Sequence, residues 1–163
     1  EHTYHEFVVG GLQVRTAQNC DHLLSVYGQG KWAIVALLNE HYGAILPKPF
    51  DLYNWIHQRE DEVASFLNEA GSNVLNYSQF GIPQKMALWL GTSGFIIGIS
   101  QLGRSFNPSK ILHYNQKTNE GAAFAFYRNC HSTIFFDDPT EANVVYMLFM
   151  MGNDALSNLP SSL

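Results

Sequence analysis

The sequence predicts an α+β domain in which helices pack on an antiparallel sheet. Between Lys110 and Asp138, three strand-length apolar runs rich in β-branched and aromatic residues alternate with turn-forming residues. The segment from Asp51 to Ala70 instead carries an apolar stripe at helical spacing. We therefore expect a sheet centred on residues 110 to 138, covered by helices.

Length and composition indicate one domain spanning residues 1 to 163. Of the 163 residues, 46% are hydrophobic and 14% are charged, which suits one compact core. The net charge of -5 and the lack of a basic patch argue against a nucleic-acid binder. No apolar run approaches the roughly 18 residues that span a bilayer. We expect a soluble protein, cytoplasmic or secreted, and a chain that begins at Glu1 without Met suits an excised domain or a processed product.

The N-terminal part is expected to form an edge strand and a helix. Phe7 to Val14 fits a strand at the edge of a sheet. Cys20 opens a segment with apolar residues at helical spacing, and Gly28 is expected to end that helix. The apolar run from Lys31 to Leu38 fits either a buried strand or a buried helix.

The middle of the chain predicts a helix, a strand and a second helix. The helix from Asp51 to Ala70 is expected to end at Gly71. Lys85 to Leu90 fits a strand, and Phe95 to Leu102 a helix. A strand, a glycine-rich loop with hydroxyl groups and a helix start together form the local geometry that binds phosphate. The loop Gly91 to Gly94 therefore predicts, as one hypothesis, a small nucleotide-binding module.

The C-terminal part is expected to form a hairpin followed by a helix. Gly121 to Tyr127 and Thr133 to Asp138 are strand-like runs joined by a short turn. Asp138 would then cap a helix from Thr140 to Met151, with Pro139 at its first position.

The order of three reactive residue types suggests nucleophilic chemistry. Cys20 lies early, at the start of a predicted helix, where backbone N–H groups and the helix dipole favour an anion. His113 and Asp138 come much later, on predicted strands. A thiol hydrolase needs a histidine to take the thiol proton and an acid to orient the imidazole.

Several short motifs resemble the papain-like cysteine peptidases, in the bacteriocin-processing (C39-type) branch. They are Asn19 to Gly28, Gly91 to Ser93, Ile111-Leu112, Gly121 to Tyr127 and Ile134 to Pro139. The resemblance implies a papain-like fold and a thiol hydrolase that acts on a peptide or isopeptide bond, with a protein or peptide as substrate.

The resemblance also assigns the site residues. Cys20 would be the nucleophile, His113 the base and Asp138 its orienter, with no metal and no cofactor. Family members carry histidine at the start of the penultimate strand, where this chain has Glu120-Gly121. His113 would therefore act from the neighbouring strand, or the domain has lost its activity.

A second hypothesis assigns no catalytic role to these residues. Cys20 fits a buried, inert thiol, Asp138 a helix cap and His113 a hydrogen-bonded structural side chain. Cys130 is an alternative nucleophile that we rank below Cys20. The protein would then be a non-catalytic domain that presents its aromatic surface to a protein partner.

Overall fold

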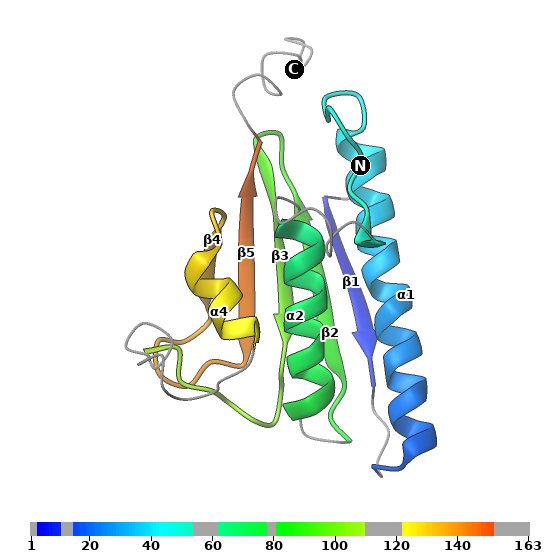
Figure 1. Cartoon of the computed structure of the whole chain (residues 1–163), viewed down its shortest axis with the longest axis vertical. Helices are drawn as coiled ribbons and strands as arrows, with labels where there is room; N and C mark the ends of the chain where they lie inside the picture. Colours follow the sequence, from blue (N-terminus) through cyan, green and yellow to red (C-terminus); the bar gives the residue numbers. More distant parts are fainter. Residues whose placement is uncertain (1–2, 11–14, 54–61, 78–80, 110–121, 152–163) are drawn as a thin grey trace.

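The computed structural model describes residues 3–10, 15–53, 62–77, 81–109 and 122–151. Within these ranges, three helices and five strands follow one another along the chain (Figure 1). In chain order they are β1 (Tyr4–Val9), α1 (Ala17–Tyr42), α2 (Glu62–Tyr77), β2 (Gln84–Leu90), β3 (Gly94–Ser100), α4 (Ala122–Asn129), β4 (Thr133–Phe136) and β5 (Val144–Met150).

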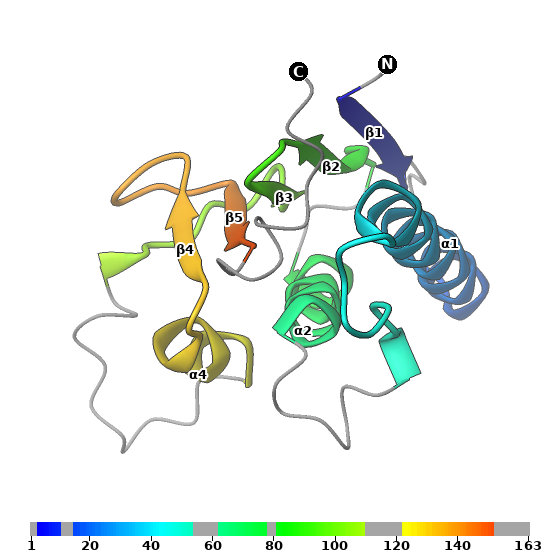
Figure 2. The same ribbon diagram turned by 90° about the horizontal axis from the view of Figure 1, so that it is seen from above.

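The strands form one antiparallel sheet in the order β1-β2-β3-β5-β4. The three helices lie on one face of this sheet, which Figure 2 shows in a view along the strands. The predicted α+β class with an antiparallel sheet is therefore confirmed. The expected centre is wrong, because β3 is the central strand and β4 an edge. Residues 110–121 lie outside the described ranges.

The strand Lys85 to Leu90 is confirmed as β2, but the helix predicted from Phe95 to Leu102 is wrong. Gly94–Ser100 is strand β3, and it pairs with β2 through a tight hairpin in which Gly91 N–H donates to the Gly94 carbonyl at 2.9 Å. Both faces of β3 carry apolar residues, so the period-2 alternation that identifies a strand is lost from the sequence.

Helix α1 is longer than expected at both ends. Thr16 caps it, since its Oγ1 accepts a hydrogen bond from Asn19 N–H at 3.1 Å. The helix then continues through Gly28 to Tyr42, so the predicted stop at Gly28 is wrong. The run Lys31 to Leu38 is therefore helix. From Tyr27 onward its buried residues recur at helical spacing: Tyr27, Gly30, Ile34, Val35, Leu38 and Tyr42.

Helix α2 also runs past its predicted end. Residues 54–61 of the predicted helix Asp51 to Ala70 lie outside the described ranges, and the helix extends through Gly71 to Tyr77. Gly71 is buried against the ring of Tyr27, whose hydroxyl donates to the Leu67 carbonyl at 3.0 Å. Gly71 is thus a helix-packing residue and not a C-cap.

The C-terminal secondary structure is reversed relative to the prediction. Ala122–Asn129 is helix α4, where a strand was expected, and Val144–Met150 is strand β5, where a helix was expected. Asp138 does cap backbone N–H groups, since its Oδ1 accepts from Thr140 and Glu141 at 2.8 and 2.7 Å. It caps a turn in the β4–β5 loop, however, and the chain then enters β5.

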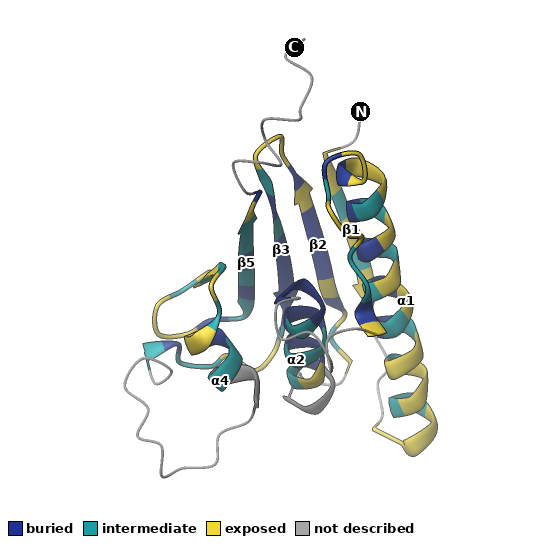
Figure 3. Ribbon diagram, turned by 45° about the horizontal axis from the view of Figure 1, so that its top comes forward, coloured by how far each residue is buried: buried dark blue, intermediate teal, exposed yellow. Residues whose placement is uncertain are grey.

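The hydrophobic core lies between the sheet and the three helices. Its largest buried side chains come from α1, α2 and the inner face of the central strands: Tyr27, Tyr42, Phe66, Phe95, Ile34, Leu38, Leu67, Met86, Leu88, Ile97, Ile99 and Met147. In Figure 3, β2, β3 and α2 are largely buried, whereas only scattered residues of α1 are buried and its first turns are largely exposed. Among the described helices, none is both long and apolar enough to cross a membrane.

Candidate functional site

The predicted catalytic residues are not gathered at one place in the described part of the chain. Cys20 lies in the first turn of α1, beyond the β1 side of the sheet, and Asp138 lies in the β4–β5 loop at the opposite side (Figures 1 and 2). His113 lies outside the described residues. The structure therefore shows no contact between the proposed nucleophile and the proposed orienting acid, and their catalytic roles remain predictions.

The second cysteine is tied to a buried carboxylate. Glu62, at the start of α2, is only 8% exposed. Its Oε1 accepts from His131 N–H at 2.6 Å and its Oε2 from Ser132 N–H at 2.8 Å. The Ser132 hydroxyl and the Cys130 thiol donate to the same carboxylate. One side chain of α2 thus anchors the turn between α4 and β4.

The hydrogen bonds of this anchor change the pKa values of both partners. Burial alone would raise the pKa of Glu62, but hydrogen bonds from Ser132, His131 and Cys130 outweigh it and hold the pKa below its ordinary value. Burial, the hydrogen bond to Glu62 and the charge of Glu62 raise the pKa of the Cys130 thiol to about 12. Cys130 is thus a neutral hydrogen-bond donor, poorly suited to act as a nucleophile.

The reactivity of the two thiols can be compared directly. At about pH 8 we expect iodoacetamide to modify Cys130 more than tenfold more slowly than N-acetylcysteine, because only about one thiol in 10⁴ is ionised at a pKa of about 12. Mass spectrometry of the Cys20→Ser variant isolates Cys130, and the Cys130→Ser variant isolates Cys20. Labelling of Cys130 as fast as the free thiol would contradict the anchor. If iodoacetamide labels Cys20 faster than it labels N-acetylcysteine, the hydrolase hypothesis is supported.

An open pocket lies beside the same anchor. It has a volume of about 500 Å³ and is lined by Glu62, His131, Ser132, Thr133, Leu148, Phe149 and Met150. The Glu62 carboxylate at its wall already accepts hydrogen bonds from the α4–β4 turn. Among the described residues, no group of three or more His, Cys, Asp or Glu side chains could hold a metal ion.

The glycine-rich segment Gly91 to Gly94 is a hairpin turn and not the start of a helix. The Tyr42 hydroxyl donates to the carbonyls of Gly91 and Gly94 at 2.7 and 2.8 Å, and accepts from Gly91 N–H at 3.2 Å. The end of α1 therefore binds this turn. Because β3 begins at Gly94, the helix N-terminus on which the phosphate-binding hypothesis depended is not formed there.

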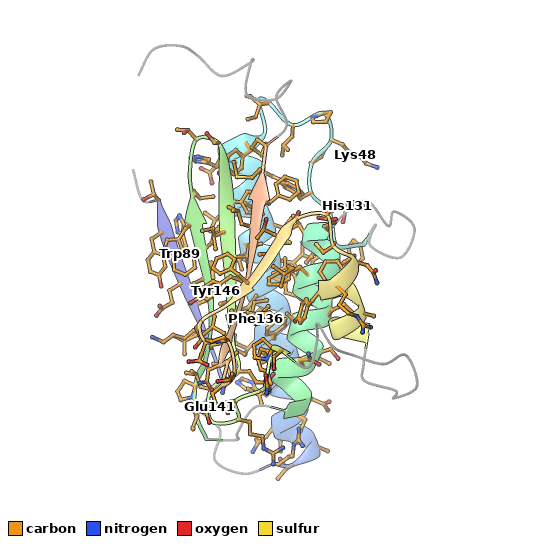
Figure 4. The ribbon with its side chains drawn as sticks, turned by 90° about the vertical axis from the view of Figure 1, so that its left-hand side faces the viewer. Lys48, Trp89, His131, Phe136, Glu141 and Tyr146 are labelled. Atoms are coloured by element: carbon orange, nitrogen blue, oxygen red, sulfur yellow. The ribbon has the colours of Figure 1, made fainter. Side chains whose placement is uncertain are left out.

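The sheet face that points away from the helices carries a band of aromatic side chains. We call this face the open face. Register and alternation place on it Tyr4 of β1, Trp89 of β2, Tyr146 of β5 and Phe135 of β4. Figure 4 shows Trp89 and Tyr146 on this side of the sheet and Phe136, the neighbour of Phe135, on the helix side.

These four rings form a continuous stripe, which we call the aromatic stripe. Tyr4 and Trp89 have ring centroids 5.1 Å apart, Trp89 and Tyr146 6.0 Å apart, and Tyr146 and Phe135 4.8 Å apart with nearly parallel planes. Tyr4 is 44% exposed, and Trp89 and Phe135 are each 37% exposed. Tyr146 is partly buried beneath its neighbours.

A glycine at the centre of the sheet makes room for the stripe. Gly98 of β3 lies directly opposite Ala87 and Tyr146. A Cβ atom at Gly98 would lie 2.9 Å from the Tyr146 ring and 3.2 Å from the Trp89 ring. Any larger residue would therefore push these rings away from the sheet. The absence of a side chain at Gly98 leaves room for these two rings, whose planes are tilted by 50° to each other.

Few charges interrupt the open face. Lys85 pairs with Glu6 at 3.3 Å, and Glu6 also accepts a hydrogen bond from the Tyr4 hydroxyl at 2.6 Å. These hydrogen bonds, from Tyr4 first and then Lys85, lower the pKa of Glu6. Burial and the nearby Asp137 carboxylate raise the pKa of Tyr146. The charged groups thus lie at the margins of the stripe, and its interior is neutral.

Sequence reasoning did not find the aromatic stripe, although part of its signal is in the sequence. Tyr4, Glu6 and Val8 alternate with inward-facing residues in β1, and all three are exposed. In β5 the outer residues Val144, Tyr146 and Leu148 are as apolar as the inner ones. That composition suggested a buried helix, whereas the structure shows a strand with an apolar outer face.

No protein-family model matches this chain, and no curated protein matches it either. The papain-like resemblance therefore has no support beyond the short motifs that suggested it. Among the described residues, the aromatic stripe is an extended and exposed apolar feature of the surface.

Proposed function

We propose that this protein is a binding domain that engages a protein partner through the aromatic stripe on its open face. The observation that carries this proposal is the row of four rings in which each contacts the next, three of them more than a third exposed. An exposed, contiguous apolar surface on a folded domain marks an interaction site. Exposed aromatic residues scattered singly would not carry this meaning.

The residue types of the stripe match the centres of protein–protein interfaces. Such centres are enriched in Tyr, Trp, Phe and Met and depleted in charge. The open face adds the exposed Met150 to its aromatic rings, and Lys85 is already paired with Glu6. Rings held against one another lose little conformational freedom on binding, which favours affinity.

The charge of the face argues against single-stranded nucleic acid as the ligand. Sheets that stack bases on aromatic residues also carry cationic side chains that follow the phosphate backbone. Here the stripe is bordered by Glu6 and Asp137, and the net charge of the chain is -5. A protein ligand needs no such cationic track.

The thiol hydrolase implied by the resemblance remains a second proposal. One observation supports it, namely that Cys20 lies in the first turn of the 26-residue helix α1. Because Asp138 is at the other side of the sheet, the binding function is better supported by the described residues. We do not carry the nucleotide-binding hypothesis further, since the Gly91 to Gly94 segment is a hairpin turn.

Photo-crosslinking tests the binding function. A benzophenone amino acid at position 146 should yield discrete adducts in cells, and the same group at position 53 should not. Tyr53 is a matched control, because it is 75% exposed but lies outside the sheet. Absence of adducts from position 146, or equal adducts from both positions, would contradict the proposal.

For the partner identified in this way, we expect Trp89→Ala to weaken binding by roughly 30-fold or more, because central aromatic residues dominate interface energies. Tyr53→Ala should leave the affinity unchanged. Isothermal titration calorimetry measures both affinities, and denaturant unfolding verifies that each variant is folded. A Trp89→Ala variant that binds as tightly as the original would show that the stripe is not the binding surface.

A further inference from the structure

The open face has the arrangement expected for contact with a second copy of itself. In a two-fold dimer, each contact between one residue and another occurs twice. If the two-fold axis runs along β3, β2 of one copy faces β5 of the other, and β1 faces β4, because the strand order is reversed across the interface. Face-to-face sheets that pack with strands nearly aligned are a common arrangement.

This axis brings the aromatic stripes of the two copies next to each other. Trp89 lies at the level of Ile96 and Leu148 along the strands, and Tyr146 at the level of Gly98 and Ala87. Because the axis keeps this level, Trp89 of one copy lies over Leu148 of the other, and Tyr146 lies over Ala87. The Trp89 and Tyr146 rings of opposite copies are offset by one alternation step, about 7 Å, along the strands. Large side chains thus lie over smaller ones, which makes the open face complementary to itself about this axis.

The same axis also matches opposite charges. Lys85 lies on β2 at the end of the sheet where β3 finishes and β5 begins. The β4–β5 loop at that end carries Asp137, Asp138 and Glu141. Figure 4 shows Glu141 at the end of the open face beyond Tyr146. Because the axis keeps this end in place and exchanges β2 with β5, Lys85 of each copy lies near the acidic loop of the other.

The open face is large enough for a dimer only if nearly all of it is used. Strands β1, β2, β3, β5 and β4 have 6, 7, 7, 7 and 4 residues. With a rise of about 3.3 Å per residue and a strand spacing of about 4.8 Å, they cover on the order of 490 Å² before side-chain relief is counted. A standard interface buries about 800 Å² of accessible surface per partner. A dimer would therefore use nearly the whole open face, with the aromatic stripe at its centre.

We infer that the partner of the open face is a second copy of this chain, packed face to face about a two-fold axis along β3. This inference rests on the proposed binding function and names its partner. Sheet-to-sheet contact buries Trp89 and Tyr146 in both copies. The Lys85 and Glu141 side chains at the rim then set the orientation of one copy on the other.

A charge exchange tests both the dimer and its orientation. Analytical ultracentrifugation of the whole chain should give the mass of a dimer. Lys85→Glu and Glu141→Lys should each raise the dissociation constant at least about tenfold, because each places like charges together on both sides of the axis. An equimolar mixture should recover the affinity, since both rim contacts then join opposite charges. Native mass spectrometry distinguishes the mixed dimer from either parent.

Three results would overturn the inference. They are a monomer at all concentrations up to hundreds of micromolar, a dimer that neither charge variant weakens, and a mixture that does not recover. A monomer that still forms adducts with a different protein from position 146 would remove the dimer and leave the binding function intact. If the protein forms neither a dimer nor adducts from position 146, the binding function is contradicted as well.

Discussion

Replacing Glu62 with alanine should lower the free energy of unfolding by about 3 kcal/mol, because hydrogen bonds to a charged group contribute about 1.5 to 3 kcal/mol each. The substitution leaves the backbone N–H groups of His131 and Ser132 without their acceptor. It also separates the start of α2 from the turn between α4 and β4. Urea unfolding followed by circular dichroism measures the change.

Asp21→Ala is the matched control, since it removes a carboxylate from an exposed position of α1 and should change stability by less than about 0.5 kcal/mol. If Glu62→Ala were equally mild, the anchor would not hold the turn in solution. Glu62→Gln is expected to be intermediate, because it keeps one acceptor oxygen but loses the charge.

The same carboxylate predicts a pH dependence. The pKa of Glu62 in the folded protein lies below the ordinary value of 4.5. Its contribution to stability is therefore complete above about pH 4.5 and is lost as the pH falls through the folded-state pKa. The Glu62→Gln variant should accordingly lose less stability on acidification than the original protein.

Gly71→Ala is expected to destabilise the protein by about 2 kcal/mol, although alanine favours helix by about 1 kcal/mol over glycine. The added Cβ would lie 2.1 Å from Cε1 of Tyr27. Tyr27 cannot move aside easily, since it is fully buried and its hydroxyl binds the Leu67 carbonyl at 3.0 Å. Overpacking should therefore outweigh the gain in helix propensity. Thermal unfolding measures the net effect.

Gly28→Ala provides the control within the same fold. A Cβ at Gly28 would meet nothing within 4 Å, so only the propensity term remains and the helix should gain about 0.5 to 1 kcal/mol. The two glycine variants should thus shift the melting temperature in opposite directions. Stabilisation by Gly71→Ala would show that α1 and α2 are not packed as closely as described.

Much of the local chemistry was predictable from the sequence. The strand at Lys85 to Leu90 formed as expected, and Asp138 caps backbone N–H groups as its position before Pro139 suggested. The α+β class followed from the alternation of strand-like and helix-like runs. These features depend on neighbouring residues alone, so a linear pattern contains them.

Two of the assignments that failed concern strands in which both faces are apolar, namely β3 and β5. In β3 and β5, the inner residues pack on the helices and the outer ones contribute to the open face, so neither strand alternates between apolar and polar residues. Because their outer residues are also apolar, the sequences of β3 and β5 resemble those of buried helices. These two misassigned strands contribute to the candidate binding face, as expected where function departs from simple core patterning.

By itself, the sequence determined a mixed α+β fold, a dominant apolar core and the capping role of Asp138, because each depends on composition or short-range spacing. Only the tertiary structure decided the strand order and the continuation of α1 and α2 through glycine residues. It also brought Tyr4, Trp89, Phe135 and Tyr146 together in one stripe. Those four residues span more than 140 positions of the chain. Only cross-strand pairing brings them into contact, and pairing between distant strands is not encoded in any local window.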